Sequence, residues 1–352
     1  MAVRMEAVAM LEGHTGRVWD AQWNPTGTLL ATASGDKTVK VWGREAVPAK
    51  DGIAAAERWV CKATLGGQHS RTVRSIAWSP CGMKLAAGSF DATATVWDRS
   101  DGEFECVATL GGHSSEVKSV AWSPTGKLIA TCSRDKTVWI WEVLDDDAEY
   151  ECLAVLNKHT QDVKHVAWHP SVEVLASCGY DDSINIYRDD PHDWLCYDSM
   201  KGHEGTVWKI AFSPDGAELA SASADGTVRL WRAYMPGNPE GVVNAASPGE
   251  IAWKCTCTLG GYHDREVYTV AWGDNGLLAT GSGDNTVRVF RRAIDDHNAP
   301  SYELFASVAE AHAEDINSVA WCPQPQEEGA SLLATASDDN KVTLWRVPAP
   351  DA

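Results

Sequence analysis

"SGDKTVKVW", residues Ser34 to Trp42, decides the fold of this 352-residue chain because close variants of it return along the whole sequence. In every copy an Asp stands six residues before a closing aromatic residue. The other copies are "SFDATATVW" from Ser89, "SRDKTVWIW" from Ser133, "GYDDSINIY" from Gly179, "SADGTVRLW" from Ser223, "SGDNTVRVF" from Ser282 and "SDDNKVTLW" from Ser337. Such a repeat predicts one architecture assembled from seven similar units.

A His opens each unit at a nearly constant distance from the repeat Asp. The separation is 22 residues in five units, 21 in the sixth and 27 in the seventh, where "QPQEEGA" is inserted. The pairs are His14 and Asp36, His69 and Asp91, His113 and Asp135, His159 and Asp181, His203 and Asp225, His263 and Asp284, and His312 and Asp339. Nine residues after each His comes an aromatic residue: Trp23, Trp78, Trp122, Trp168, Phe212, Trp272 and Trp321.

Segments within each unit alternate apolar and polar residues, as in "VKSVAWS" from Val117, and turn dipeptides such as Thr26-Gly27 separate them. This pattern predicts four short antiparallel strands, a to d, in one sheet per unit. The chain ends on a c strand, "TLWRV". We therefore expect Glu6 to Leu11 to supply the missing d strand and to close the ring, which removes two open sheet edges.

The repeat resembles the WD-repeat family, whose units of about 40 to 45 residues form the blades of β-propellers. The resemblance implies an all-β fold with residues 1–352 as a single seven-bladed β-propeller, whose repeats begin near His14, His69, His113, His159, His203, His263 and His312. It also implies a hydrogen-bonded chain in each blade, formed in blade one by His14, Ser34, Asp36 and Trp42. The matching c-strand Trp residues are Trp97, Trp141, Trp231 and Trp345. Gly179 and Tyr187 in blade four and Phe290 in blade six depart from the pattern, and predict weaker networks there.

Bulk composition favours protein partners. The net charge of −19 argues against non-specific binding to nucleic acid or to an anionic membrane. No apolar stretch approaches the length needed to cross a bilayer, and "MAVRMEAVAMLEGH" lacks the build of a secretory signal. We expect an intracellular protein that binds neither nucleic acid nor membrane.

The His and Asp residues could also suggest catalysis or metal binding. A catalytic set needs one convergent cluster, whereas these pairs are distributed one per blade, so we expect a structural role. Five of the ten Cys follow an aromatic residue by two positions on strand d, which places them in different blades. Cys255 and Cys257 are the one close pair, and two thiolates without further ligands make a poor zinc site. We predict no enzyme, no catalytic residues, no cofactor and no metal.

Binding residues are expected on the face that carries the d-to-a and b-to-c loops, here called the top. The residue after the first apolar position of each strand a should face the channel mouth, and it reads Trp19, Arg74, Lys118, Lys164, Trp208, Tyr268 and Asn317. The residue before each repeat Asp lies nearby and reads Gly35, Phe90, Arg134, Tyr180, Ala224, Gly283 and Asp338. Blades two to four thus present cations beside aromatic rings, a composition that suits acidic or C-terminal carboxylate partners. The alternative is that these residues are scattered and share no ligand.

Long insertions, by contrast, fall on the opposite rim, the bottom. They are Gly43 to Arg58, Arg232 to Ala252 and Gln324 to Ser331, and acidic runs begin at Asp145, Asp189 and Asp295 in other c-to-d turns. We interpret them as solubilising loops, with the bottom insertions as the second candidate for partner binding.

Several stretches resemble a narrower family, the WD-repeat subunits of the cytosolic iron-sulfur protein assembly targeting complex. They are "RTVRSIAWSPCG" from Arg71, "EFECVATL" from Glu103, "EVKSVAWSPTGKLIATCSRDKTVWIWEV" from Glu116, "HTQDVKHVAWHPS" from His159 and "YMPGN" from Tyr234. The resemblance implies a scaffold that links assembly factors to apoprotein clients, a monomer within a hetero-complex, in the cytoplasm and also the nucleus. Arg134 matches the top-face Arg of that family. The alternative is a WD-repeat adaptor of another complex, such as a chromatin reader or a ubiquitin-ligase substrate receptor.

Overall fold

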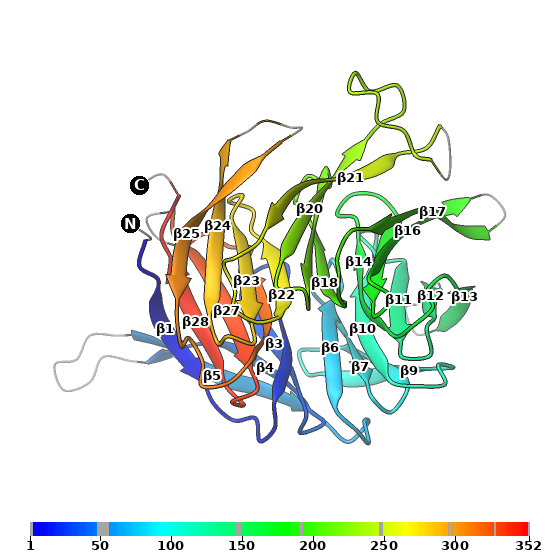
Figure 1. Cartoon of the computed structure of the whole chain (residues 1–352). Coiled ribbons are helices and arrows are strands. Elements are labelled where there is room, and N and C mark those ends of the chain that lie inside the picture. The colour runs from blue at the N-terminus through cyan, green and yellow to red at the C-terminus, as the bar shows by residue number, and fades with distance from the viewer. Residues whose placement is uncertain are drawn as a thin grey trace.

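The computed structural model describes residues 3–47, 56–144, 149–190, 193–245, 249–294, 296, 299–326 and 329–350. These residues form seven four-stranded antiparallel sheets arranged around a central axis (Figure 1). The predicted all-β, seven-bladed β-propeller is therefore confirmed. Within the described ranges no helix has the length and apolar character needed to span a membrane.

Each blade contains strands a to d in order from the axis outward. The a strands are β2 (Val18–Trp23), β6 (Val73–Trp78), β10 (Val117–Trp122), β14 (Val163–Trp168), β18 (Val207–Phe212), β22 (Val267–Trp272) and β26 (Ile316–Trp321). The b strands are β3 (Leu29–Ser34), β7 (Lys84–Ser89), β11 (Leu128–Ser133), β15 (Val174–Gly179), β19 (Glu218–Ser223), β23 (Leu278–Ser282) and β27 (Ser331–Ser337).

The c strands follow the repeated phrase, and the d strands form the rim. The c strands are β4 (Val39–Val47), β8 (Thr93–Asp98), β12 (Val138–Val143), β16 (Ser183–Asp190), β20 (Val228–Tyr234), β24 (Val287–Ile294) and β28 (Val342–Val347). The d strands are β5 (Ala56–Leu65), β9 (Glu105–Gly111), β13 (Tyr150–Leu156), β17 (Asp193–Lys201), β21 (Ala252–Leu259), β25 (Ser301–Val308) and β1 (Glu6–Leu11).

The ring closes through the N-terminal strand, as the sequence predicted. β1 pairs with β28 in the blade that otherwise contains β26 and β27, and it lies beside β28 in Figure 1. Leu11 is 3% exposed and packs with Trp42 of blade one. A second connection was not foreseen: the indole N–H of Trp23 donates to the carbonyl of Ala320 at 3.1 Å, which joins the first blade to the last.

Aromatic residues on strands a and d pack together within a blade. Trp23 meets Trp59 with ring centroids 5.4 Å apart, and Trp168 meets Trp194 at 5.6 Å, both in edge-to-face geometry. Such pairs contribute about 0.5–1.5 kcal/mol beyond the area that they bury. Between blades the core is apolar: Val39 and Val41 of blade one pack with Val73 and Ile76 of blade two. The regular Trp spacing therefore reflects packing.

The expected hydrogen-bonded chain exists, but Ser34 is not its middle member. In blade one His14 Nδ1 lies 2.8 Å from Asp36 Oδ2, and His14 Nε2 lies 2.8 Å from Thr32 Oγ1. The Trp42 indole N–H donates to the same Thr32 hydroxyl at 2.9 Å. Ser34 instead donates to the Gly16 carbonyl. Because Thr32 and Ser34 lie on the same face of one strand, sequence spacing alone could not distinguish them.

The hydroxyl of this chain occupies equivalent places in most blades. It comes from strand b as Thr131, Ser177, Ser221, Thr280 and Thr335. Blade two has Ala87 at that position, and Thr95, its partner on strand c, supplies the hydroxyl that contacts His69 at 2.9 Å and accepts from Trp97 at 3.0 Å. The network is therefore kept even where one strand loses its hydroxyl.

Blade four differs from blade one in two contacts of this network, and it gains one, because Asn185 Nδ2 lies 3.0 Å from His159 Nε2. Gly179 has no hydroxyl for the amide N–H of Asp181, whereas Ser34 accepts this bond from Asp36 in blade one. The bond between Ser177 Oγ and the Tyr187 hydroxyl is 3.3 Å long, longer than the 2.9 Å bond of Trp42. A Cβ atom on Gly179 would lie 2.3 Å from the carbonyl oxygen of Asp162, so this position has no room for the Ser of the other blades.

Blade six replaces the Trp by Phe290 and brings an arginine to its histidine. Arg288 NH1 lies 2.6 Å from His263 Nδ1 and 3.0 Å from Asp284 Oδ2. The guanidinium and the carboxylate therefore share one ring nitrogen, since His263 Nδ1 also lies 3.0 Å from Asp284 Oδ2, while Nε2 lies 2.8 Å from Thr280 Oγ1. Burial and the charge of Arg288 lower the pKa of His263 to about 4. The His is therefore held neutral.

Replacing Arg288 with Thr should raise the pKa of His263 toward its usual value of 6.5. Thr is chosen because blades two and seven have Thr95 and Thr343 at this register. The unfolded chain binds more protons than the wild-type protein between pH 6.5 and 4, so wild-type stability falls as pH falls through this window. His263 accounts for about 3 kcal/mol of that fall. Histidine NMR titration and urea unfolding at several pH values measure both effects.

The control for this substitution is Arg291→Thr, which changes an arginine on the same strand whose partner is the exposed Glu303. It should leave the pKa of His263 unchanged. An unchanged pKa in Arg288→Thr as well would contradict the effect assigned to the charge of Arg288.

One bottom insertion is more regular than predicted. β4 and β5 extend into Gly43 to Arg58 as a paired ladder that reaches Val47 and Ala56, so the flanks of this insertion are strand and not loop. The acidic run from Asp145 falls mostly outside the described residues, as do parts of the runs at Asp189 and Asp295 and of the insertions Gly43 to Arg58, Arg232 to Ala252 and Gln324 to Ser331.

Candidate functional site

The top mouth of the channel is a cavity of about 300 Å³. Its lining includes all seven of the predicted strand a positions: Trp19, Arg74, Lys118, Lys164, Trp208, Tyr268 and Asn317. Phe90 and Asp338, from the second predicted set, and Arg17 and Asp315 complete the lining. The structure therefore brings together side chains from blades that are distant in sequence.

A β-bulge positions each mouth residue of strand a. The pairing of strands a and b shifts register between Val18 and Asp20 in blade one, and at the same place in the other six blades. The skipped residue, Trp19 in blade one, therefore has no partner in the ladder. A bulge re-aims its side chain and is common near binding sites. Seven bulges thus present seven side chains to one opening.

Cations at the mouth lie on aromatic faces. Arg74 stands over Trp19 at 4.8 Å from the ring centroid, Lys118 over Phe90 at 3.9 Å, and Lys164 over Tyr180 at 3.5 Å. Burial and the nearby Lys164 lower the pKa of Lys118 to about 8. These cations are held in fixed positions with little water around them, where a charged partner gains more than at an open surface.

Tyr180 supports this arrangement from the side. Its ring meets Trp208 in edge-to-face geometry at 5.7 Å, and Trp208 meets Tyr268 at 5.5 Å in the same way. Tyr180 does not line the cavity itself. The three rings form a continuous aromatic surface from blade four to blade six.

Arg134 lies on the rim and not in the cavity. Its side chain is 59% exposed, and its guanidinium lies 3.5 Å from Glu116, which also pairs with Arg71 at 3.3 Å. Arg71 stands over Phe90 at 5.9 Å. The rim and the mouth are therefore connected through Phe90.

The mouth also has an acidic side, of which the sequence analysis named Asp338 but not Asp315. Asp338 accepts from Asn317 at 2.7 Å and pairs with Arg17 at 3.2 Å, and Asp315 pairs with Arg265 at 3.4 Å. The predicted local reversal of charge is thus confined to blades two to four. One sequence position could have indicated some of these charged residues. Directly before the first apolar residue of strand a stand Arg17, Glu116 and Asp315.

The other chemistry-bearing residues stay dispersed. The predicted structural His and Asp residues pair one to a blade, with distances of 2.8 to 3.1 Å. Among the described residues no group of three or more His, Cys, Asp or Glu side chains could hold a metal ion. The ten Cys are free thiols, and burial raises the pKa of Cys257, which favours its protonated form.

Comparisons with known proteins agree with the fold. The profile of the family "WD domain, G-beta repeat" matches residues 5–43, 59–98, 104–142, 150–188, 194–232, 253–291 and 305–346. The chain is 56% identical over 348 residues to "Probable cytosolic iron-sulfur protein assembly protein Ciao1" of Culex quinquefasciatus, which covers 97% of this chain and 98% of the relative.

Two further relatives come from distant organisms. "Probable cytosolic iron-sulfur protein assembly protein CIAO1" of Rattus norvegicus is 52% identical over 336 residues, with 95% of this chain and 94% of the relative covered. "Protein CIA1" of Arabidopsis thaliana is 47% identical over 350 residues, with 97% and 96% covered. The chain therefore belongs to the WD-repeat family and, within it, to the group of cytosolic iron-sulfur protein assembly proteins.

Proposed function

We propose that this protein is a non-catalytic scaffold of cytosolic iron-sulfur protein assembly, which links assembly factors to apoprotein clients. The names of its relatives support the assembly role. Iron-sulfur clusters are then cargo that the partners carry, and the protein itself holds none. We place it in the cytoplasm and also in the nucleus, as a monomer within a hetero-complex whose single seven-bladed unit spans residues 1–352.

The top face is the partner surface in this proposal. The observation that carries it is the set of cations at the mouth, each fixed over an aromatic ring, on a protein whose net charge is −19. Aromatic and arginine residues dominate the binding energy of protein interfaces. A segment with acidic side chains or a terminal carboxylate would complement blades two to four.

Arg134 is an exposed residue of this surface, with 59% of its side chain accessible to a partner. Its guanidinium keeps donors beyond its contact with Glu116, because a guanidinium carries five N–H groups. Glu116 and Arg71 orient it at the edge of the mouth. A partner that enters the mouth between Phe90 and Lys164 would therefore pass Arg134.

The test is affinity purification of tagged wild-type protein and of Arg134→Glu from host lysate, with partners identified by mass spectrometry. We expect the wild type to recover assembly factors and iron-sulfur clients, and the variant to lose one of these groups by about tenfold or more, the ratio for about 1.4 kcal/mol of binding energy. Circular dichroism confirms that both proteins are folded.

The matched control is Arg58→Glu, which reverses an exposed arginine paired with Glu45 on the bottom hairpin. It should keep both groups of partners. Equal recovery by all three proteins would exclude Arg134 as a key contact and direct attention to the bottom insertions, and recovery of no assembly factor would contradict the proposed role.

A further inference from the structure

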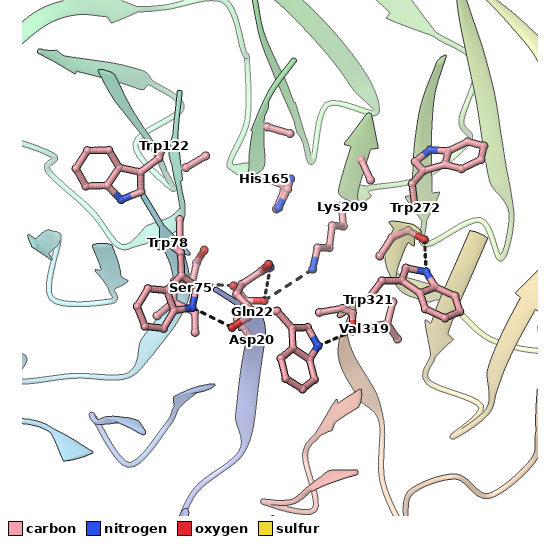
Figure 2. A pocket seen from close by; sticks show the side chains of 18 of the residues that line it. Asp20, Gln22, Ser75, Trp78, Trp122, His165, Lys209, Trp272, Val319 and Trp321 are labelled. Atoms are coloured by element: carbon pink, nitrogen blue, oxygen red, sulfur yellow. Dashed lines mark hydrogen bonds and ion pairs between the residues drawn. The ribbon is translucent and has the colours of Figure 1, made fainter. Parts of the chain in front are cut away.

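A layer of side chains divides the axial channel below the top mouth. The layer consists of the residue that follows each bulge: Asp20, Ser75, Ser119, His165, Lys209, Thr269 and Ser318. Beneath it lies a lower chamber of about 450 Å³, which extends to Asn24 and Pro25 in a turn on the bottom face. Figure 2 shows Asp20, His165 and Lys209 pointing toward the centre from different blades.

Four members of the layer connect neighbouring blades. Each accepts a hydrogen bond from a backbone N–H of the next blade: Asp20 from Ile76 at 3.1 Å, Ser75 from Val120 at 3.3 Å, Ser119 from Val166 at 3.4 Å and Thr269 from Val319 at 3.1 Å. In the described part of the chain neither His165 nor Lys209 makes this bond. Ser318 does not make it either, but its hydroxyl donates to Asp20 of blade one. His165 and Lys209 are thus the two positions that place a nitrogen group in the channel.

His165 has unused hydrogen-bonding capacity. Its Nδ1 atom is buried and has no partner among the described residues. Burial and the charges of Lys209 and Arg74 hold the pKa of His165 well below 6.5, so the ring is neutral and offers one donor and one acceptor. A buried polar atom without a partner costs about 1–3 kcal/mol. A bound polar group would remove this cost.

Lys209 also keeps a donor. Its Nζ lies 3.2 Å from Ser318 Oγ and 3.8 Å from Asp20 Oδ1 (Figure 2). Asp20 is already satisfied, because it accepts from Ala21, Gln22, Ile76 and Ser318 at 2.9 to 3.3 Å. An ammonium group has three donors, so at least one remains for a ligand.

The local charge selects the sign of that ligand. Lys209 and Arg74 carry two positive charges near the layer, and Asp20 carries one negative charge. One negative charge on a ligand would neutralise the site, whereas a dianion would add repulsion with Asp20 and a cation would be repelled by Lys209.

The chamber below has room for an uncharged body. Six of the seven strands place alanine on its wall: Ala77, Ala121, Ala167, Ala211, Ala271 and Ala320. Its volume falls within the range of small-molecule sites, which combine an apolar lining with a few polar groups. The opening on the bottom face keeps it separate from the top-face surface.

We propose that the lower chamber binds a small monocarboxylate, with its carboxylate on Lys209 and His165 and its uncharged body between the alanines. This inference does not rest on the assembly role, because it concerns the opposite end of the channel. The site would let a small metabolite occupy the propeller while the top face holds a protein.

The test uses sodium butyrate as the probe and full-length protein labelled with ¹⁵N in its histidines. Butyrate should shift the His165 ring signals saturably, and calorimetry should give the affinity. The uncharged isostere butyramide and the dianion succinate should bind at least about tenfold more weakly, the ratio for loss of one charge-assisted contact.

Two variants separate binding in the chamber from binding elsewhere. Lys209→Met removes the ammonium group and leaves Asp20 with its four other donors, and Ala211→Phe fills the chamber while keeping Lys209 and His165. Both should lose butyrate binding while circular dichroism shows a folded protein, and Arg134→Gln on the top rim should keep it. Absence of a saturable shift, or binding that survives both variants, would overturn the proposal.

Discussion

Replacing Asp135 with alanine is expected to lower the free energy of unfolding by about 3–5 kcal/mol, the cost of leaving several hydrogen-bond donors without their acceptor. The carboxylate accepts four hydrogen bonds, from His113 Nδ1 at 2.8 Å, from the Ser114 amide at 3.0 Å, and from the Thr137 amide and hydroxyl at 3.0 and 2.5 Å. Alanine would leave these donors without an acceptor. Urea unfolding at neutral pH measures the difference.

The pH dependence provides a check on the cause. Although burial alone would raise the pKa of Asp135, hydrogen bonds from His113 and Thr137 hold it well below its usual range. The folded pKa is thus lower than the unfolded one, so the stabilisation is present above about pH 4 and is lost as pH falls further. The difference between wild type and variant should shrink in the same direction.

Asp101→Ala is the control, because Asp101 is exposed in a turn of blade two. It should change stability by no more than about 0.5 kcal/mol. A loss below about 1 kcal/mol for Asp135→Ala would mean that water replaces the carboxylate, and that the His and Asp of each blade are dispensable.

Deleting residues 1–11 should have the second large effect, a loss of about 5 kcal/mol or more together with self-association. The deletion removes β1 and exposes the edge of β28, which β1 covers from Leu11 opposite Val342 to Glu6 opposite Arg346. It also removes the buried Met5 and Leu11 from two core clusters. Thermal unfolding and size-exclusion chromatography measure the two consequences.

Deleting residues 1–2 is the matched control, since it shortens the chain but keeps β1 and the bond from the Val3 amide to the Phe305 carbonyl. It should elute as the wild type does, with a nearly unchanged midpoint. Adding a peptide of residues 1–13 to the longer deletion should restore the midpoint in part. Normal stability of the longer deletion without the peptide would show that ring closure does not depend on β1.

Much of the fold was predictable because each blade repeats the same physical requirements. The His and Asp spacing, the alternation of apolar residues and the unpaired last c strand together predicted seven sheets and their closure by β1. The error over Ser34 and Thr32 has a simple cause. Residues two apart on a strand share a face, and only the pairing of Thr32 with Lys40 places the former beside both His14 and Trp42.

The candidate site was less accessible to sequence reasoning. Positional counting identified Trp19 and its equivalents, but it could not reveal the bulge that follows Val18. Strict alternation assigns Asp20 to the core, and the bulge instead lets both Trp19 and Asp20 border the channel. For this reason His165 and Lys209, the same position in later blades, were missed.

The contacts between blades are unequal around the ring. Indole N–H groups donate to backbone carbonyls of the preceding blade: Trp78 to Gln22, Trp168 to Ala121 and Trp321 to Ala271. The bond from Trp23 to Ala320 that closes the ring is of the same kind. Blade five lacks this indole bond at both of its junctions, with blade four and with blade six. Phe212 has no N–H for blade four, and the Trp272 indole, which would bond to blade five, has no partner among the described residues.

The hydrogen bonds of the layer are also missing from the same two junctions. His165 and Lys209 stand there in place of the hydroxyls that accept these bonds in other blades. Blade five is instead joined to its neighbours farther from the axis: Arg188 of blade four pairs with Glu250, the Trp253 amide donates to Asp198, and Arg292 of blade six pairs with Glu218. The polar contacts of this blade thus lie toward the rim, which leaves the inner wall at its two junctions free to carry the two nitrogen groups of the channel.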